Sequence, residues 1–188
     1  PPPGRRDPVD IIEEGAETAI RSLVPIRYGR MSEGPFTFFR GTAAIMAADL
    51  RTSTVTGIHA QLCGDAHVSN FGLYGAADRS IVFDIGDFDE PLRGPWVWDV
   101  KRLAASFVLA ARENGWNAEV QRSVATMSTT SYRHAMRTFA EMDDLDVWYS
   151  RLDMDRATDL HESITSKADR RAVEKARSKD SKQAARKL

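Results

Sequence analysis

Residues 64–70 read Gly-Asp-Ala-His-Val-Ser-Asn, and residues 84–90 read Asp-Ile-Gly-Asp-Phe-Asp-Glu. The first stretch places a carboxylate, Asp65, five positions before an amide, Asn70. The second gathers four carboxylates within seven residues, and such charges repel one another unless water or a cation lies between them. We therefore expect the chemistry of this chain to lie in these two stretches, and the segments around them decide how they meet.

The segment between the two stretches predicts a β-hairpin. Apolar residues at 71–74 and 80–83 flank a five-residue loop at 75–79. Since paired strands of nearly equal length bring their outer ends side by side, this hairpin would join Asn70 to the acidic cluster. Upstream, residues 58–63 alternate apolar and polar side chains, which is typical of a half-buried strand.

Helices are expected over most of the remaining sequence. Asp7 before Pro8 is typical of an N-cap and predicts a helix over residues 8–23 that Pro25 ends or kinks. The helix expected at 96–112 is so apolar that it should be the central buried one. Its inner face is expected to carry Val100, Leu103, Phe107 and Ala110 or Ala111. The fold class expected is α+β and helix-rich. Further helices are predicted at 42–50, at 117–142 with Asn117 as its cap, and at 144–152.

The composition is that of one ordinary soluble domain. The chain has 188 residues, 42% hydrophobic and 28% charged, and its formal net charge of −1 argues against a nucleic-acid-binding surface over the whole domain. It has no run of about 18 apolar residues that could cross a bilayer, so no membrane association is expected. The single Cys63 excludes an internal disulfide and predicts a buried, inert thiol, and we expect a cytoplasmic location.

The order of residues in the two stretches is that of the catalytic segment of protein kinases, where an Asp is followed by an Asn and then by an Asp-Phe pair. A carboxylate beside an acceptor hydroxyl can orient it and take its proton, which is the role expected of Asp65. Magnesium prefers oxygen ligands, so Asn70 with Asp84 or Asp87 could hold it against nucleotide phosphates. Turn positions for Asp65 and Asn70, and a solvated acidic loop, fit the same spacing, and both interpretations stay open.

Three further residues have two interpretations each. His67 could contact phosphate or make only local hydrogen bonds. Arg40, between three aromatic residues and a glycine, could reach phosphate or form a surface ion pair. Asp99 at the start of the buried helix is either an acid favoured by the helix N-terminus or an anchor for the backbone of the 64–70 loop.

Four motifs of the chain are found together. With them the chain resembles the bacterial domain-of-unknown-function 2252 family, strongly over residues 24–112 and more loosely in the flanks. That family is similar in turn to the kinase-like superfamily of aminoglycoside and choline phosphotransferases, whose His-Gly-Asp or Asn-Asp loop precedes an Asn and later an Ile-Asp-Phe or Ile-Asp-Trp segment. The motifs are Phe-Thr-Phe-Phe-Arg-Gly at 36–41, Leu-Cys-Gly-Asp-Ala-His-Val-Ser-Asn-Phe-Gly at 62–72, Val-Phe-Asp to Asp-Phe-Asp-Glu at 82–90, and Gly-Pro-Trp to Trp-Asp-Val-Lys-Arg-Leu-Ala at 94–104.

The resemblance implies a fold like the C-terminal lobe of the protein kinases, with the small hairpin carrying the metal site. It implies Asp65 as the catalytic base and Asn70 as the first metal ligand. For the second ligand Asp84 fits better by its distance from Asn70, whereas Asp87 fits better by its Phe88 neighbour, and Asp87 is preferred. Two departures from the relatives are Cys63 in place of a frequent His and Asp89 in place of the Gly of the protein-kinase triplet.

The function that the resemblance implies is Mg²⁺- and ATP-dependent phosphoryl transfer to a hydroxyl of a small molecule or a protein, with nucleotidyl transfer as a variant. Asn70, Arg40 and His67 would then contact the nucleotide. The alternative is a non-catalytic nucleotide-binding, metal-binding or regulatory module of kinase-like fold. A helical interaction domain without a ligand is a third class.

One part of a kinase is missing before the catalytic segment, namely the Gly-rich loop and the strand Lys that hold ATP. The resembled family carries a Gly-rich stretch and a Val-Lys-Glu segment further towards the C-terminus. The chain is therefore expected to be a fragment, as its start without Met also suggests. We expect residues 1–152 to form the catalytic-lobe portion and residues 153–188, with nine Lys or Arg against three Asp or Glu from 166 to 188, to form a basic helical or frayed tail.

Overall fold

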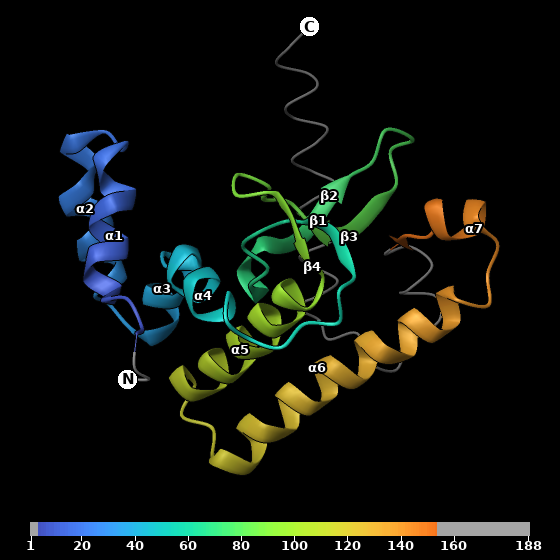
Figure 1. Cartoon of the computed structure of the whole chain (residues 1–188). Coiled ribbons are helices and arrows are strands. Elements are labelled where there is room, and N and C mark those ends of the chain that lie inside the picture. The colour runs from blue at the N-terminus through green and yellow to red at the C-terminus, as the bar shows by residue number, and fades with distance from the viewer. Residues whose placement is uncertain (1–3, 154–188) are drawn as a thin grey trace, which may run out of the picture. The chain divides into compact units, whose positions relative to one another are not determined.

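The computed structural model describes residues 4–153 and is α+β and helix-rich, as the sequence predicts (Figure 1). The described chain forms two compact units. The first unit comprises residues 4–68 and 87–137, and the second comprises residues 69–86 and 138–153. The chain enters the second unit after residue 68 and leaves it at residue 86. Residues 64–70 and residues 84–90 are therefore each divided between the two units.

The first unit opens with α1 (Pro8–Glu17), whose N-cap is Asp7 as predicted, with Oδ1 accepting a hydrogen bond from Val9 N at 2.8 Å. The single helix expected over 8–23 is wrong. α1 ends at Glu17, a 3₁₀ turn η1 (Arg21–Leu23) follows, and Pro25 opens α2 (Val24–Met31) instead of ending a helix. In the first turn of a helix the missing proline N–H leaves no intrahelical bond unmade, so this position suits Pro25.

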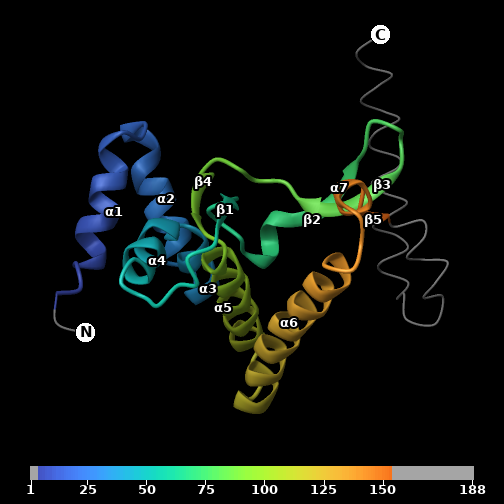
Figure 2. The same ribbon diagram turned by 45° about the vertical axis from the view of Figure 1, so that its right-hand side comes forward.

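Two short helices, α3 (Pro35–Arg40) and α4 (Ala43–Leu50), come next. α4 confirms the helix predicted at 42–50, whereas α3 takes up the aromatic residues that the sequence analysis left without an element. Both helices pack against α5 (Val97–Glu113), and α4 also packs against α1 (Figures 1 and 2). This arrangement puts α4 between the N-terminal helix and the central one.

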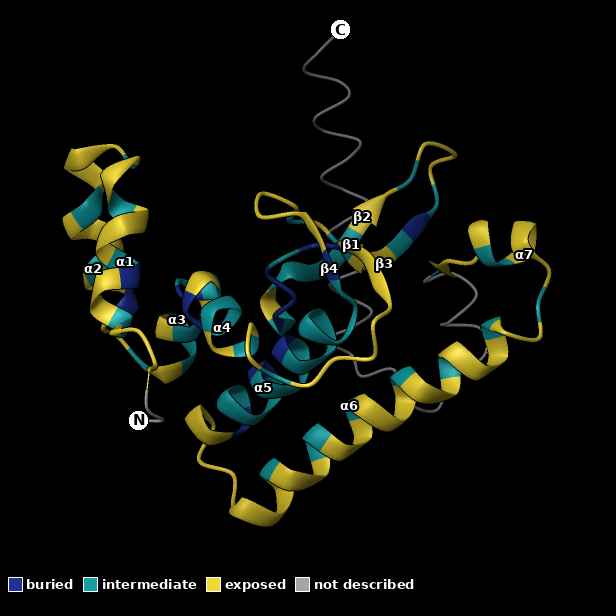
Figure 3. Ribbon diagram, in the orientation of Figure 1, coloured by how far each residue is buried: buried dark blue, intermediate teal, exposed yellow. Residues whose placement is uncertain are grey.

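α5 is the central buried helix, as predicted. Every residue from 95 to 111 is buried or half-buried (Figure 3). Of the residues expected on its inner face, Val100, Leu103 and Phe107 are only half-buried, whereas Ala111 is fully buried. The fully buried residues of the helix are Arg102, Ser106 and Ala111. Two of these three are polar. The buried side of the helix must therefore lie against a segment whose polar groups form hydrogen bonds with them.

The strand predicted at 58–63 is β1 (His59–Leu62), which pairs antiparallel with β4 (Leu92–Pro95) in a two-stranded sheet. Its predicted half-burial is wrong, since Ile58 beside it is 63% exposed and only Leu62 of the strand is buried. Alternation shows which side chains share a face. Whether that face is buried depends on what covers it.

α6 (Ala118–Phe139) begins after Asn117, whose Oδ1 accepts hydrogen bonds from the N–H groups of Glu119 and Val120 at 3.1 and 3.0 Å. The predicted cap is therefore confirmed. None of the residues of α6 is fully buried, and the side chain of Met127 is 64% exposed.

The second unit is built on the predicted hairpin, β2 (Phe71–Gly75) and β3 (Ile81–Ile85), joined by a five-residue loop. β5 (Leu152–Asp153) pairs with β3 on the other side (Figure 2). The helix predicted at 144–152 is shorter, because α7 (Asp144–Trp148) ends where the chain turns towards β5. The tail predicted at 153–188 lies, from residue 154 on, outside the described residues.

No helix within residues 4–153 has both the length and the apolar character that crossing a bilayer requires.

Candidate functional site

Asp99 anchors the loop that carries Asp65. Its carboxylate accepts hydrogen bonds from Cys63 N at 2.9 Å and Gly64 N at 3.3 Å. Asp99 also stands in the first turn of α5, where a negative charge is favoured by the helix dipole. Both interpretations that the sequence left open are therefore true of this residue.

The expected base, Asp65, is buried and paired with Arg102 of α5. Arg102 Nε donates to Asp65 Oδ1 at 2.5 Å, and the two residues are 3% and 7% exposed. Arg102 also donates to the carbonyl of Phe39 at 2.8 Å and lies 4.3 Å over the centre of that ring. One guanidinium therefore fixes the orientation of the Asp65 carboxylate and joins the loop to α3.

Ser106 completes this face of α5. Its hydroxyl accepts a hydrogen bond from Val68 N at 3.0 Å and donates to Leu103 O at 2.7 Å, and the residue is fully buried. Asp99, Arg102 and Ser106 follow one another at steps of three and four residues, so they line one side of the helix. We name these three residues the α5 polar face.

The sequence analysis missed Arg102 and Ser106 as site residues. The signal that could have identified them is their spacing of three and seven residues from Asp99, which puts all three side chains on one side of the helix. Polar side chains on the buried side of a helix need hydrogen-bond partners there, and a neighbouring loop with unpaired N–H groups supplies them.

Gly64 brings the loop against the acidic stretch. Its φ is +87°, and a Cβ placed on it would lie 1.9 Å from the carbonyl oxygen of Glu90. Burial raises the pKa of Glu90 above its usual range, and the carboxylates of Asp65 and Asp87 raise it further. Asp65 and part of the acidic stretch therefore share one electrostatic environment within the first unit.

His67 is buried beside Asp65, with Nε2 3.5 Å from Asp65 Oδ2. Its Nδ1 is buried without a hydrogen-bond partner among the described residues. Burial lowers the pKa of His67, and the charges of Arg40 and Arg102 lower it as well, against the opposing effect of Asp65. A neutral imidazole is thus favoured at this position.

Arg40 lies at the end of α3, where its side chain is exposed. Among residues 4–153 its guanidinium has no ion-pair partner, so the surface ion pair that the sequence left open is not formed there. Its charge reaches His67, as the lowered pKa of that imidazole indicates. Arg40 and His67 therefore lie in the same electrostatic neighbourhood.

Cys63 is a buried thiol, as predicted. Burial and the nearby Asp99 carboxylate raise its pKa to about 12. A thiol of this kind is a poor nucleophile at neutral pH, because the thiolate is the reactive form.

The second unit holds two of the expected metal ligands on one hairpin. Gly72 of β2 pairs with Asp84 of β3, and the pairing continues to a hydrogen bond from Gly86 N to Asn70 O at 3.0 Å. Position 70, the last residue of a 3₁₀ turn η2 (Val68–Asn70), therefore lies one residue before β2, next to the end of β3 that carries Asp84. Asp84 is exposed, and its Oδ1 accepts a hydrogen bond from Ile85 N at 2.7 Å.

Asp87 belongs to the first unit with Asp65, and its Oδ1 accepts from Asp89 N at 3.2 Å. Within the described part of the chain, no group of three or more His, Cys, Asp or Glu side chains is arranged to hold a metal ion. The amide and carboxylate oxygens at positions 70 and 84 are the donor type that Mg²⁺ prefers.

Comparison with known proteins gives one match. The model of a family described as an uncharacterized protein conserved in bacteria (DUF2252) matches residues 19–188. The search of curated proteins finds no match. The search of solved structures finds none either.

Proposed function

The chain belongs to the bacterial DUF2252 family, and from that premise we propose that it carries the catalytic-loop portion of a Mg²⁺- and ATP-dependent phosphotransferase that acts on a hydroxyl of a small molecule or a protein. The observation that carries the proposal is the anchor made by Asp99, which holds the backbone at Cys63 and Gly64 and so fixes the loop of Asp65 on a buried helix. Phosphoryl transfer is catalysed mainly by positioning and by charge, so a rigidly held acidic loop suits it.

In this proposal Asn70 and Asp84 hold the metal. Asn70 and Asp84 lie at the same end of the hairpin in the second unit, whereas Asp87 belongs to the first unit. This supports Asp84 as the second ligand, although the family resemblance favours Asp87. Bound Mg²⁺ would neutralise the charge of the nucleotide phosphates. Arg40, exposed and without an ion-pair partner among residues 4–153, is the cation we assign to phosphate contact.

Asp65 is assigned to the acceptor hydroxyl. Arg102 donates to Oδ1 of Asp65, and Oδ2 of Asp65 lies on the side of His67. The ion pair with Arg102 fixes the orientation of the Asp65 carboxylate, and the neutral imidazole favoured at His67 adds no competing positive charge.

A second function is favoured by one observation, namely that Asp65 is only 7% exposed and already paired. A carboxylate that is buried in an ion pair can hold a loop together without touching a substrate. The chain would then be a nucleotide-binding or metal-binding module without turnover.

Binding and turnover measurements separate the two functions. We expect MgATP to raise the melting temperature of the 188-residue chain and EDTA to abolish that rise. Asp84→Ala should weaken MgATP binding about tenfold or more, since it removes a charged metal ligand. Asp89→Ala is the matched control, because Asp89 is an exposed acid of the same stretch with no role in the proposal, and it should bind as the wild type does.

Asp65→Asn distinguishes enzyme from module. If Asp65 acts on the acceptor, Asp65→Asn should keep MgATP binding and lose ATP hydrolysis, with water as the acceptor. If the chain is a module, the wild type has no hydrolysis to lose. Absence of Mg²⁺-dependent ATP binding in the wild type would contradict both functions.

A further inference from the structure

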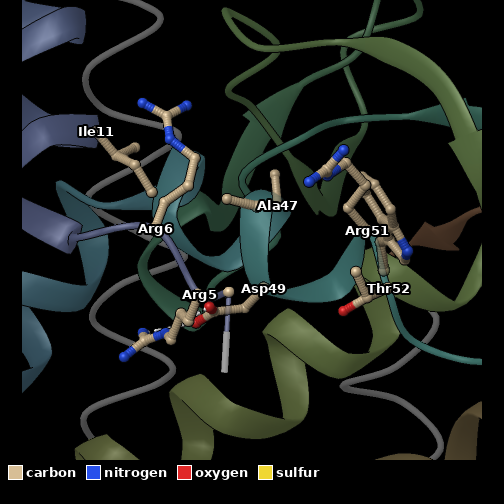
Figure 4. A pocket seen from close by; sticks show the side chains of 10 residues that line it. Arg5, Arg6, Ile11, Ala47, Asp49, Arg51 and Thr52 are labelled. Carbon is tan, nitrogen blue, oxygen red and sulfur yellow. Dashed lines mark hydrogen bonds and ion pairs between the residues drawn. The ribbon is translucent and has the colours of Figure 1, made fainter. Parts of the chain in front are cut away.

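A second candidate site lies in the first unit, apart from the loop of Asp65. It is a cavity of about 910 Å³ formed by the segment before α1, by the C-terminal half of α4 and by the start of α5 (Figure 4). None of the candidate residues of the phosphotransferase site lines it. The lining residues that matter here are Arg5, Arg6, Ile11, Asp49, Arg51 and Trp98.

Two of the three arginines in this cavity have acidic partners. Arg5 binds Asp49 with two hydrogen bonds, Nε to Oδ1 at 2.7 Å and Nη2 to Oδ2 at 2.8 Å. Arg6 forms an ion pair with Glu14 of α1, which does not line the cavity. These pairs hold the segment before α1 in place and so give the cavity a fixed wall.

The other two donors have no partner. Arg51 is exposed and makes no side-chain hydrogen bond or ion pair within residues 4–153. The indole Nε1 of Trp98 is buried and likewise has no hydrogen-bond partner in the described chain. Figure 4 shows Arg6 and Arg51 on opposite sides of Ala47. The cavity therefore presents one exposed cation, Arg51, whose hydrogen bonds are unmade, and the ring of Trp98 forms part of its wall.

We propose that this cavity binds an anionic organic molecule, namely a phosphate or carboxylate on an apolar or aromatic body. An arginine side chain can only donate, so the group that satisfies Arg51 must be an acceptor. A guanidinium matches phosphate and carboxylate oxygens with paired hydrogen bonds. The three arginines outweigh Asp49, so the lining has an excess of positive charge.

The volume and the lining of the cavity indicate the size and the apolar character of the rest of the ligand. Its volume is in the range of small-molecule sites and is far larger than one inorganic anion needs. Ile11, alanines of α4 and the ring of Trp98 give it an apolar side. Trp98 directly precedes Asp99, so the ligand would contact the residue next to the anchor of the Asp65 loop.

The test follows the indole N–H signals of the ¹⁵N-labelled 188-residue chain in EDTA buffer without nucleotide, with Trp98→Phe to assign the Trp98 signal. The probes are phenyl phosphate, benzoate, inorganic phosphate and phenol. We expect phenyl phosphate or benzoate to shift the Trp98 signal saturably, and the tighter of the two identifies the anionic group. Inorganic phosphate should bind more weakly, and phenol should cause no saturable shift.

Arg51→Gln keeps a side chain of similar length without the charge and should weaken binding of the tighter probe about tenfold, because a hydrogen bond to a charged group is lost. Arg30→Gln is the matched control, an exposed arginine of α2 outside the cavity, and should bind as the wild type does. The proposal is overturned if neither organic anion shifts the Trp98 signal, if phenol shifts it equally, or if Arg51→Gln binds unchanged. Because magnesium and ATP are absent, failure here leaves the phosphotransferase proposal to its own test.

Discussion

Gly64 is the residue on which the position of the Asp65 loop depends most directly. Its φ of +87° lies in the left-handed region, and the carbonyl of Glu90 occupies the space that a side chain would need. The contact is with backbone, so neither partner can move aside by a change of rotamer. The loop and the acidic stretch can approach this closely only because position 64 has no Cβ.

Gly64→Ala should therefore lower stability by more than the backbone cost of about 1–3 kcal/mol that a strained φ imposes. Gly57→Ala is the matched control, since Gly57 has a φ of +79° and no atom within 4 Å of an added Cβ. Urea unfolding of both variants measures the difference. Equal losses of stability would show that Glu90 does not press on position 64.

Cys63, next to this glycine, gives a prediction about reactivity. With a pKa of about 12 against 9.0 for the ordinary thiol, the folded chain should hold roughly a thousandfold less thiolate at pH 8 than the unfolded chain. The rate of reaction with a disulfide reagent, measured with and without denaturant, checks this. A native rate within tenfold of the denatured one would contradict it.

At the scale of elements, α5 has two functions. Its apolar side chains make it the central helix, and the α5 polar face binds the 63–68 loop at three points in succession. Each of these bonds satisfies a group that would otherwise be buried without a partner. The helix therefore sets the conformation of the loop as well as supporting it.

Ser106→Ala should destabilise the chain by about 1–3 kcal/mol, because Val68 N loses its acceptor in a buried place. Ser128→Ala on α6 is the matched control, since the Ser128 hydroxyl also donates to the carbonyl three residues earlier but accepts no hydrogen bond from another segment of residues 4–153. Thermal or urea unfolding compares the two. Comparable losses from both variants would remove the special role of Ser106.

At the scale of the whole chain, the Asp65–Arg102 pair contributes to global stability through its burial. Arg102 touches the loop, Phe39 of α3 and Met46 of α4, so one side chain holds together parts of three elements. Burying two charges is costly, and their attraction mostly offsets that cost. Removing one partner leaves the other charge buried alone.

Arg102→Met should accordingly cost about 3–5 kcal/mol of unfolding free energy. The double variant Asp65→Asn with Arg102→Met should be less destabilised than the sum of the two single variants, because the second change removes the stranded charge. Global unfolding in urea of all four proteins gives the coupling energy. Simple additivity would contradict a direct interaction between Asp65 and Arg102.

Much of the local structure could be predicted from the sequence. The Asp7 and Asn117 caps, the hairpin at 71–85 and the central helix follow from side-chain chemistry close by in the chain. The errors lie where the local signal was ambiguous. A proline such as Pro25 can end a helix or occupy the first turn of one. Which of the two occurs depends on whether the preceding residues are helical.

For the candidate site, the sequence by itself determined which residue types are available and that Asp65, Asn70 and the acids at 84–90 lie near the ends of a strand and a hairpin. Only the tertiary structure decided that Asp65 is buried against Arg102 and that the backbone of Glu90 lies against Gly64. The physical reason is the separation along the chain over which each kind of interaction acts. Caps, turns and periodicity act within a few residues, whereas burial and ion pairing depend on groups that are distant in the chain and meet only after folding.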